Sequence, residues 1–448
     1  MVRLCVEAVA GDAPAVLGVV ERAVQEGSAL IGRAVMEGVA NLAGGGPAAT
    51  AECGHGHRAR LVQPRPKTIR TLFGEIATVR GYYHCDACHR GFAPLDDRLG
   101  MAGTSLSPGL VQACAATGME APYAKSRDLV QKVTGLPFVS ASTINRVTIS
   151  EGARARRLVD AELAAAKPGP VPHAWAEDRP DKCYLVLDGT GAPMLPSETR
   201  GRAGKDGGQA GTREVKIGCF FTQSGLDEAG DPVQDPGSVS YISTFEAVAG
   251  FAGMVKAEYY RRGFDQIRQP VILGDGAKWI WGIANDRFPA ATQIVDYFHA
   301  REHLTDLTGH VTPLLDDPIV WAATAEQALH VGDIDQLVDA VTLLDLDSLP
   351  ADIAHKAQVE VGYFTANQHR MDYARFRCLG YYIGSGSVES ACNMLVKQRA
   401  KRAGMHWTIR GLDPVIALRT LNHSGRDHLI WTTNQVKTNT QSVVSPQC

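Results

Sequence analysis

The stretch Lys182–Gly191 reads Lys-Cys-Tyr-Leu-Val-Leu-Asp-Gly-Thr-Gly and indicates the fold more clearly than any other. Its apolar centre, Tyr184–Leu187, is short and rich in residues that favour strands, so it predicts a buried strand. Asp188 should end that strand, and Gly189 and Gly191 should let the backbone turn away. A carboxylate there can hold a metal ion at the rim of a cleft. The alternative is that this aspartate only caps a turn.

Two further acidic residues strengthen the metal interpretation. Pro270–Gly276 (Pro-Val-Ile-Leu-Gly-Asp-Gly) repeats the pattern, an apolar strand followed by Asp275 next to glycine. Ile383–Ser390 (Ile-Gly-Ser-Gly-Ser-Val-Glu-Ser) predicts the start of a helix with Glu389 in its first turn. Hard cations such as Mg²⁺ prefer oxygen ligands, and phosphoryl transfer uses paired ions about 3.5–4 Å apart. These three acidic residues are therefore the predicted catalytic metal ligands.

Composition limits the class of protein. With 448 residues and a net charge of −3, the chain is long enough for several domains and is not generally basic. Contacts with nucleic acid must then come from local patches. The N-terminus, with Glu7 and Asp12, does not resemble a secretory signal, and no apolar run reaches the roughly 20 residues that span a bilayer. Ten mostly scattered cysteines fit reduced thiols and a metal site. We expect a soluble, cytoplasmic protein with no membrane partner.

Residues 47–100 predict a zinc-ribbon-like domain. Two knuckles, Cys53-Gly-His-Gly-His57 and Cys85-Asp-Ala-Cys88, flank a hairpin-like stretch. A zinc ribbon needs four tetrahedral nitrogen or sulfur ligands. The predicted zinc ligands are Cys53, His57, Cys85 and Cys88. His55 is the other candidate for the fourth ligand, and reduced surface cysteines without a metal are the alternative interpretation.

Basic residues surround these knuckles and outnumber the acidic ones. They are Arg58, Arg60, Arg65, Lys67, Arg70, Arg80 and Arg90. Such a patch can neutralise the phosphates of a nucleic acid. A solvated charged face is the alternative.

Residues 101–166 predict helices, with breaks at Gly118, at Pro122 and at Gly135-Leu-Pro137. Tyr123–Thr134, a break and Ser140–Arg146 resemble a helix-turn-helix, with Ser140 or Ser142 as the N-cap of the second helix. The residues predicted to face a DNA major groove are Ser142, Thr143, Asn145 and Arg146. Ordinary packed helices are the alternative.

The rest of the chain predicts an α/β core. After the Lys182 strand, the order is two more strands, helix, strand, helix, strand, helix, which favours a mixed sheet covered by helices. An all-helical stretch follows before the Glu389 helix. The predicted boundaries are 1–46 for an N-terminal helical segment, 47–100 for the ribbon, 101–166 for the helical DNA-binding region, 167–181 for a linker, 182–311 for the first part of the catalytic core, 312–375 for an all-helical insertion, 376–432 for the Glu-bearing helix and C-terminal part of the core, and 433–448 for a disordered tail.

The Glu389 helix also carries a basic segment. We expect Ser387 to cap it and Ala403-Gly404 to end it. Cations on this helix would lie where a DNA backbone approaches the metal ions; a solvated helix face is the alternative. The basic residues predicted to contact DNA are Lys397, Arg399, Lys401, Arg402 and Arg410.

Two segments, Asp275-Gly-Ala-Lys-Trp-Ile-Trp281 and Ile383–Ser390 with the trailing Lys397–Trp407, resemble bacterial insertion-sequence DDE transposases allied to the Mutator group (the Kra-type subgroup). The resemblance extends from the ribbon-like segment to about Trp431. It implies a ribonuclease-H-like catalytic core with an all-helical insertion. It also implies two Mg²⁺ ions, which Mn²⁺ can replace, and DNA strand cleavage and strand transfer at terminal inverted repeats.

On this resemblance, Asp188, Asp275 and Glu389 are the metal ligands. Asp296-Tyr-Phe-His299 is similar to the Asp/Cys-x-x-His motif of the group, which implies that His299 lies near the bound strand; a histidine taken alone is more often a packing residue. The first knuckle departs from the Cys-x-x-Cys usual in such a family, because Gly56 stands at its last position.

The implied partners are DNA at the element ends and at the target, with a homodimer or higher oligomer associated with the nucleoid. Three other functions remain open on the sequence. They are a non-catalytic DNA-binding protein derived from a transposase, a metal-dependent nuclease without strand transfer, and a glycosidase that uses two carboxylates. The last is the weakest, because no aromatic sugar-binding cleft is evident and a basic helix fits sugars poorly.

Overall fold

The computed structural model describes residues 16–101, 103–137, 139–169, 179–204 and 207–431. The chain divides into two compact units, residues 1–151 with 431–448 and residues 152–430. The middle of the predicted linker and the whole predicted tail lie outside the described residues. In the described ranges, no helix combines the length and the apolar character that crossing a membrane requires.

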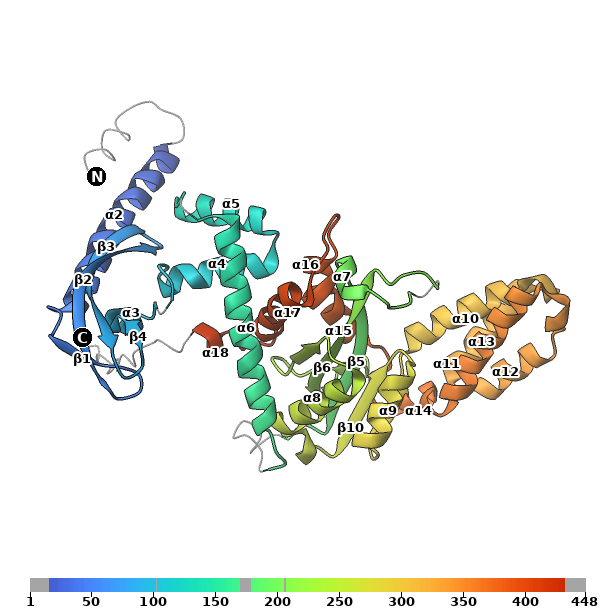
Figure 1. The fold of residues 1–448 in the computed structure, drawn as a ribbon. Helices are drawn as coiled ribbons and strands as arrows, with labels where there is room; N and C mark the ends of the chain where they lie inside the picture. The colour runs from blue at the N-terminus through green and yellow to red at the C-terminus, as the bar shows by residue number, and fades with distance from the viewer. Residues whose placement is uncertain (1–15, 102, 138, 170–178, 205–206, 432–448) are drawn as a thin grey trace, which may run out of the picture. The chain divides into compact units, whose positions relative to one another are not determined.

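The first unit contains a four-stranded antiparallel sheet whose strands are neighbours in chain order. A long helix packs along β3 (Figure 1), and its Ala40 shares a buried cluster with Ile69 and Ile76 of the sheet. The N-terminal helix is therefore part of the core of the ribbon-like sheet. The elements are α2 (Val16–Gly44), β1 (Thr50–Glu52), β2 (Arg58–Thr71), β3 (Gly74–Cys85) and β4 (Arg90–Phe92).

Four helices follow this sheet: α3 (Pro94–Arg98), α4 (Pro108–Glu120), α5 (Tyr123–Thr134) and α6 (Ala141–Ala165). Ser140 is the N-cap of α6, since its Oγ accepts a hydrogen bond from the Thr143 amide at 3.1 Å. The predicted break at Gly118 is wrong. Gly118 lies inside α4, where a Cβ would come within 2.1 Å of Thr148 Oγ1 on α6. This glycine therefore allows two helices to pack closely.

The second unit is built on a five-stranded mixed sheet of order β11-β10-β5-β6-β9. Taken in chain order, the first three strands of this sheet are β5, β6 and β9, and they are antiparallel neighbours. Strands β10 and β11 add parallel strands on the other side of β5. Apart from a short helix and a small hairpin between the first three strands, the order of three strands, helix, strand, helix, strand, helix is the predicted one. The elements are β5 (Lys182–Pro193), α7 (Pro196–Thr199), β6 (Thr212–Gln223), the small hairpin β7 (Gly225–Leu226) and β8 (Pro232–Val233), β9 (Ser240–Thr244), α8 (Val248–Arg261), β10 (Gln269–Gly274), α9 (Lys278–Arg287), β11 (Thr292–Val295) and α10 (Tyr297–Val311).

Strand β5 does not end at Asp188, as the sequence had predicted. It continues to Pro193, because β6 stays paired with it over its full length. Gly189 and Gly191 do not turn the chain. They make room for side chains of β6, since a Cβ at Gly189 would lie 2.2 Å from Glu214 Oε1.

The stretch between the sheet and the Glu389 helix is helical in all its main elements, as predicted. Helix α10 leads out of the sheet and packs against α11 and α13 (Figure 1). The helices are α11 (Pro318–Val331), α12 (Ile334–Thr342), α13 (Ala351–Asn367) and α14 (Tyr373–Cys378).

The Glu389 helix is irregular. It consists of α15 (Gly386–Ala391), a π-helical turn η6 (Cys392–Lys397) and α16 (Gln398–Ala400). Single π-helical turns occur often at functional sites. Helices α17 (Ile409–His423) and α18 (His428–Trp431) complete the described chain.

Both predicted ends of this helix are wrong. The N-cap position is Ser385 rather than Ser387, and the Ser385 side chain bonds Asp296 instead of the helix amides. The C-terminal end is Ala400 rather than Ala403, because the backbone already leaves the helical region at Lys401. Gly404, with φ of 74°, lies in the turn that follows.

Candidate active site and metal centre

The register of the sheet brings two of the predicted carboxylates together. Leu187 of β5 pairs with Gly274 of β10 in a parallel arrangement, and an aspartate follows each of them directly. Asp188 and Asp275 therefore emerge side by side. Both line a cavity of about 530 Å³, and Glu389 of α15 lines it as well. The three predicted carboxylates, far apart in the sequence, thus share one cavity.

Asp188 is half-buried and held at both oxygens. Its Oδ1 accepts a hydrogen bond from the Gly189 amide at 2.6 Å, and its Oδ2 accepts one from Cys392 Sγ at 3.0 Å. Burial raises the pKa of the Asp188 carboxyl; the two hydrogen bonds oppose this rise, and the negative charge of Asp275 adds to it. The sequence did not indicate a role for Cys392, whose position opposite Asp188 depends on packing between η6 and β5.

Asp275 is connected to the helical insertion. Its Oδ1 accepts from the Ala277 amide at 2.9 Å, and its backbone carbonyl accepts from the Tyr363 hydroxyl of α13 at 3.1 Å. Gly276 adopts φ of 98°, and a Cβ there would lie 2.5 Å from the Tyr363 ring. Glycine is required at this position, since it permits both the left-handed backbone and the close ring.

Negative charge accumulates around Glu389. Burial raises the pKa of its carboxyl, and the carboxylates of Asp296, Glu302 and Asp188 raise it further, while His299 opposes the rise. Carboxylates that disfavour one another's ionisation fit a site for a divalent cation, whose charge would remove the repulsion. The donors are all hard oxygens, which Mg²⁺ and Mn²⁺ prefer.

His299 lies in the lining of the same cavity, with its Nδ1 3.2 Å from Glu302. Asp296, which begins the same motif, is fully buried. Its carboxylate caps α10 and also accepts a hydrogen bond from the Ser385 amide at 2.6 Å. Asp296 therefore ties the start of the Glu389 helix to the sheet. The sequence did not indicate this positioning contact, although an aspartate before a helical run is a recognisable N-cap.

The basic residues of the last helix differ in exposure. Lys397 is exposed and lines the carboxylate cavity. Lys401 Nζ donates to Thr190 Oγ1 at 3.2 Å. Arg399 is only 1% exposed, and its guanidinium lies over the ring of Trp407 at 4.9 Å. The prediction that Arg399 contacts DNA is therefore wrong, because its guanidinium is buried and not accessible at the surface. Arg402 and Arg410 are exposed.

The aromatic side chains near Glu389 belong to a neighbouring cavity of about 590 Å³, whose lining includes Phe298 and Tyr382. Glu389 lines both cavities, but Asp188 and Asp275 line only the carboxylate cavity.

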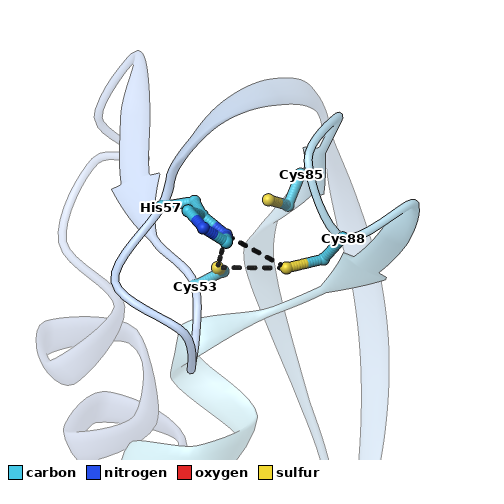
Figure 2. Close-up of side chains that lie close together, drawn as sticks. All are labelled: Cys53, His57, Cys85 and Cys88. Atoms are coloured by element: carbon cyan, nitrogen blue, oxygen red, sulfur yellow. Dashed lines mark hydrogen bonds between the residues drawn. The ribbon is translucent and has the colours of Figure 1, made fainter.

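The second predicted metal site lies on the small sheet. Ligand atoms of Cys53, His57, Cys85 and Cys88 all lie within 4.8 Å of one another (Figure 2). Cys88 Sγ is 3.8 Å from Cys53 Sγ and 3.2 Å from His57 Nδ1. His55 Nδ1 is also 3.4 Å from Cys88 Sγ, but only His57 completes the four-residue group.

The chemistry of this group suits zinc. The pKa of Cys53 is lowered to about 6, chiefly by a backbone hydrogen bond at His55. Burial and the neighbouring thiols raise the pKa of Cys88 to about 11. Three thiols this close cannot all ionise without a cation, and three sulfurs with one imidazole form a common structural zinc set. Gly56, with φ of 77°, shapes the loop that brings Cys53 and His57 together.

The two sets differ in how tightly they are gathered. Among the described residues, the Cys53 group is the one in which three or more such side chains surround a single point. The three carboxylates are not gathered in this way; they line an open cavity of about 530 Å³.

The predicted DNA-facing residues of α6 lie on its first two turns. Ser142, Asn145 and Arg146 are all exposed.

No family model matches this chain, and no curated protein sequence matches it. Among solved structures, it is similar to the Drosophila P element transposase strand transfer complex. That similarity covers 74% of this chain and 83% of the other chain, at 12% sequence identity and a TM-score of 0.24. A score this low does not establish a shared fold.

Proposed function

We propose that this chain is an insertion-sequence DNA transposase that binds terminal inverted repeats and catalyses DNA strand cleavage and strand transfer. The observation that carries the proposal is the meeting of Asp188, Asp275 and Glu389 in one cavity, next to the exposed Lys397. Carboxylates from three separate elements that crowd one cavity, with a cation at its edge, suit the phosphodiester backbone as substrate.

The sheet supports a ribonuclease-H-like assignment of the core. Three antiparallel strands precede two parallel ones, and the first strand is central. Asp188 and Asp275 each directly follow a residue of the pair Leu187–Gly274, which joins the parallel strands β5 and β10. The all-helical insertion contacts the second of them through Tyr363. The contact ties the insertion to the geometry of the site.

Asp188, Asp275 and Glu389 would hold two Mg²⁺ ions, or Mn²⁺ in their place. When bound, such ions supply activation of the attacking oxygen and stabilisation of the leaving oxygen. The protein itself contributes positioning. Cys392 and Gly189 fix the orientation of Asp188, and Asp296 fixes the start of the Glu389 helix.

The remaining side chains of the cavity would act on the DNA strand. Lys397 lines the cavity and would neutralise a backbone phosphate close to the carboxylates. His299, which lies on α10 and lines the same cavity, would contact the same DNA strand. Lys401, Arg402 and Arg410 would extend the basic path.

The first unit would bind the element ends. We assign a structural zinc ion to Cys53, His57, Cys85 and Cys88, which would hold the ribbon together. Ser142, Asn145 and Arg146 would face the DNA from α6. Because transposition joins two ends, we expect a homodimer or higher oligomer on DNA.

A cleavage and strand-transfer assay tests this function. The purified full chain is incubated with DNA flanking its own gene and with a target plasmid, with Mg²⁺ and separately with EDTA. We expect nicks at the element ends and joined products only with Mg²⁺. Binding of the ends without any cleavage in Mg²⁺ or Mn²⁺ would contradict the proposal and favour a non-catalytic DNA-binding protein.

A metal-dependent nuclease is the second candidate, since the same carboxylate cavity would serve hydrolysis alone. Cleavage without joined products would favour it. A glycosidase receives no support from the cavity, because no described aromatic ring other than His299 lines it. The aromatic rings beside Glu389 lie in the neighbouring cavity, away from both aspartates.

A further inference from the structure

We infer that a second cavity, formed within the first unit, binds a phosphate of the DNA backbone. The cavity measures about 550 Å³, and its lining includes Lys67, Arg70, Arg80 and Arg146. This inference rests on the proposed function for the identity of DNA as the partner. It assigns Arg146 to the backbone, whereas the helix-turn-helix pattern alone would have it read bases.

The fold gathers these cations from distant parts of the chain. Lys67 and Arg70 lie on β2, Arg80 lies on β3, and Arg146 lies on α6. Residues 103–106 form another part of the lining. Two backbone hydrogen bonds of 2.8 Å fix this segment to β2, from the Arg70 amide to the Ser105 carbonyl and from the Ser107 amide to the Arg70 carbonyl. The cavity is therefore a fixed feature of the sheet and its adjoining segment.

Positive charge exceeds negative charge in the lining. Asp96 is the single acidic residue, and it pairs with Lys67 Nζ at 3.0 Å and with Arg80 Nη1 at 2.8 Å. Four cations and one carboxylate leave a formal charge of +3. Counting Glu75, which pairs with Arg70 at 2.9 Å outside the lining, still leaves +2. A concave site with this excess attracts anions.

The site also offers unused hydrogen-bond donors. Arg146 is exposed and has no ion pair with any residue that the structure describes. The Nε of Arg80 is buried and has no hydrogen-bond partner among the described residues. Thr104, Ser105 and Thr143 add polar side chains to the lining. Guanidinium groups with free N–H bonds match the oxygens of a phosphate.

A phosphate of a duplex fits the surroundings better than a small free anion. Ser142 and Asn145 are exposed on the same first turns of α6 that bring Arg146 to the cavity. A duplex whose backbone is held at the cavity would present its base edges to those two polar side chains. Phosphate contacts of this kind position a protein on DNA and carry no sequence information.

The test measures DNA affinity by fluorescence anisotropy over a series of salt concentrations, with the full chain and two duplexes of unrelated sequence. For Arg146→Gln we expect the same factor of lost affinity on both duplexes. We also expect the slope of log affinity against log salt to fall by about 0.9, the contribution of one phosphate contact. Arg146→Lys should keep most of the slope, because the charge remains.

Arg127→Gln is the matched control, an arginine of the neighbouring helix α5 that pairs with Asp128 and does not line the cavity. Its slope should equal that of the wild type. Zinc content and circular dichroism of each variant establish that the unit stays folded.

Two results would overturn the inference. A loss of affinity by Arg146→Gln on one duplex only would show base reading. An unchanged slope, with inorganic phosphate binding to the wild type and not to the variant, would show a site for a free anion. The enzymatic proposal is judged separately by the cleavage assay, so a lowered slope in a protein that does not cut DNA would retain this inference and reject that function.

Discussion

The thiol cluster on the small sheet (Cys53, His57, Cys85 and Cys88) and the carboxylate cavity in the larger one are both suited to cations, but they are built differently. The four thiol-cluster residues come from two short knuckles of one hairpin and surround a single point. The carboxylates come from β5, the loop after β10 and α15, and they line an open cavity. A closed set of soft ligands suits a structural ion, whereas an open set of hard ligands leaves room for a substrate.

This difference also determines what each ion would contribute. The small sheet has limited apolar packing, with Ala59, Tyr83 and the cysteines themselves forming one of its clusters. The larger sheet is enclosed by buried aliphatic residues, such as those of β5 and β10. We therefore expect zinc to stabilise the fold of the first region, and Mg²⁺ to matter for chemistry in the second.

Loss of zinc should have the largest effect. Cys88→Ser, or treatment of the full chain with a zinc chelator, should unfold the β1–β4 sheet, because structural zinc sites in small domains contribute about 10–16 kcal/mol at neutral pH. Hydrogen exchange of residues 50–92 and zinc content measure this. Cys378→Ser, an exposed cysteine outside the cluster, is the control. A zinc-free protein whose β2 and β3 amides stay protected would contradict the structural role.

Removal of one carboxylate should affect activity and leave the fold intact. Asp188→Asn, Asp275→Asn and Glu389→Gln should each lower the cleavage rate by about 10³-fold or more, since several kcal/mol of transition-state stabilisation are lost. Zinc content should not change. Glu326→Gln, which removes an exposed partner of Arg301, is the control. Normal cleavage by any of the three variants would remove that residue from the site.

The fourth thiol-cluster ligand can be identified by comparing two histidines. His57→Ala should weaken zinc affinity by at least about 10–100-fold, the loss that follows removal of a residue that only orients a metal ligand. His55 lies close enough to Cys88 to replace His57 in part and so limit the loss. His55→Ala should have little effect. Competition with a zinc-binding dye measures both affinities, and a larger loss for His55→Ala would exchange the two assignments.

The smallest effect is expected at Cys392. Cys392→Ala removes the hydrogen bond that lowers the pKa of Asp188, so this pKa should rise further. The carboxylate that binds the ion then forms only at higher pH, and the acid limb of the cleavage profile should move upward by less than about one pH unit. Cys183→Ala, at a buried position of β5 with no contact to Asp188, should leave the profile unchanged. A shift to lower pH would contradict this account.

Much of the fold was predictable, because its local patterns are strong. Apolar runs such as Tyr184–Leu187 mark buried strands, and their order along the chain predicted the mixed sheet. The knuckles around Cys53 and Cys85 predicted the thiol cluster, since ligands a few residues apart are brought together by the turn itself. The two ligands of each knuckle are close in sequence, and the pairing of β2 with β3 brings the two knuckles together.

Other features depended on partners that no local pattern reveals. Ser385 rather than Ser387 precedes the Glu389 helix, where Asp296 holds it. Arg399 reads as a surface cation, yet it is buried against Trp407. Gly118 reads as a break, yet it makes room for Thr148.

By itself, the sequence determined the order of strands and helices and the presence of an acidic residue after each of two apolar runs. It did so because the choice between helix and strand follows from periodicity and turn residues. The tertiary structure decided that β5 continues past Asp188, that Asp188 and Asp275 lie side by side, and that Glu389 faces the same cavity. Register and burial settle these points, since they arise from hydrogen bonds and packing between segments far apart in the chain.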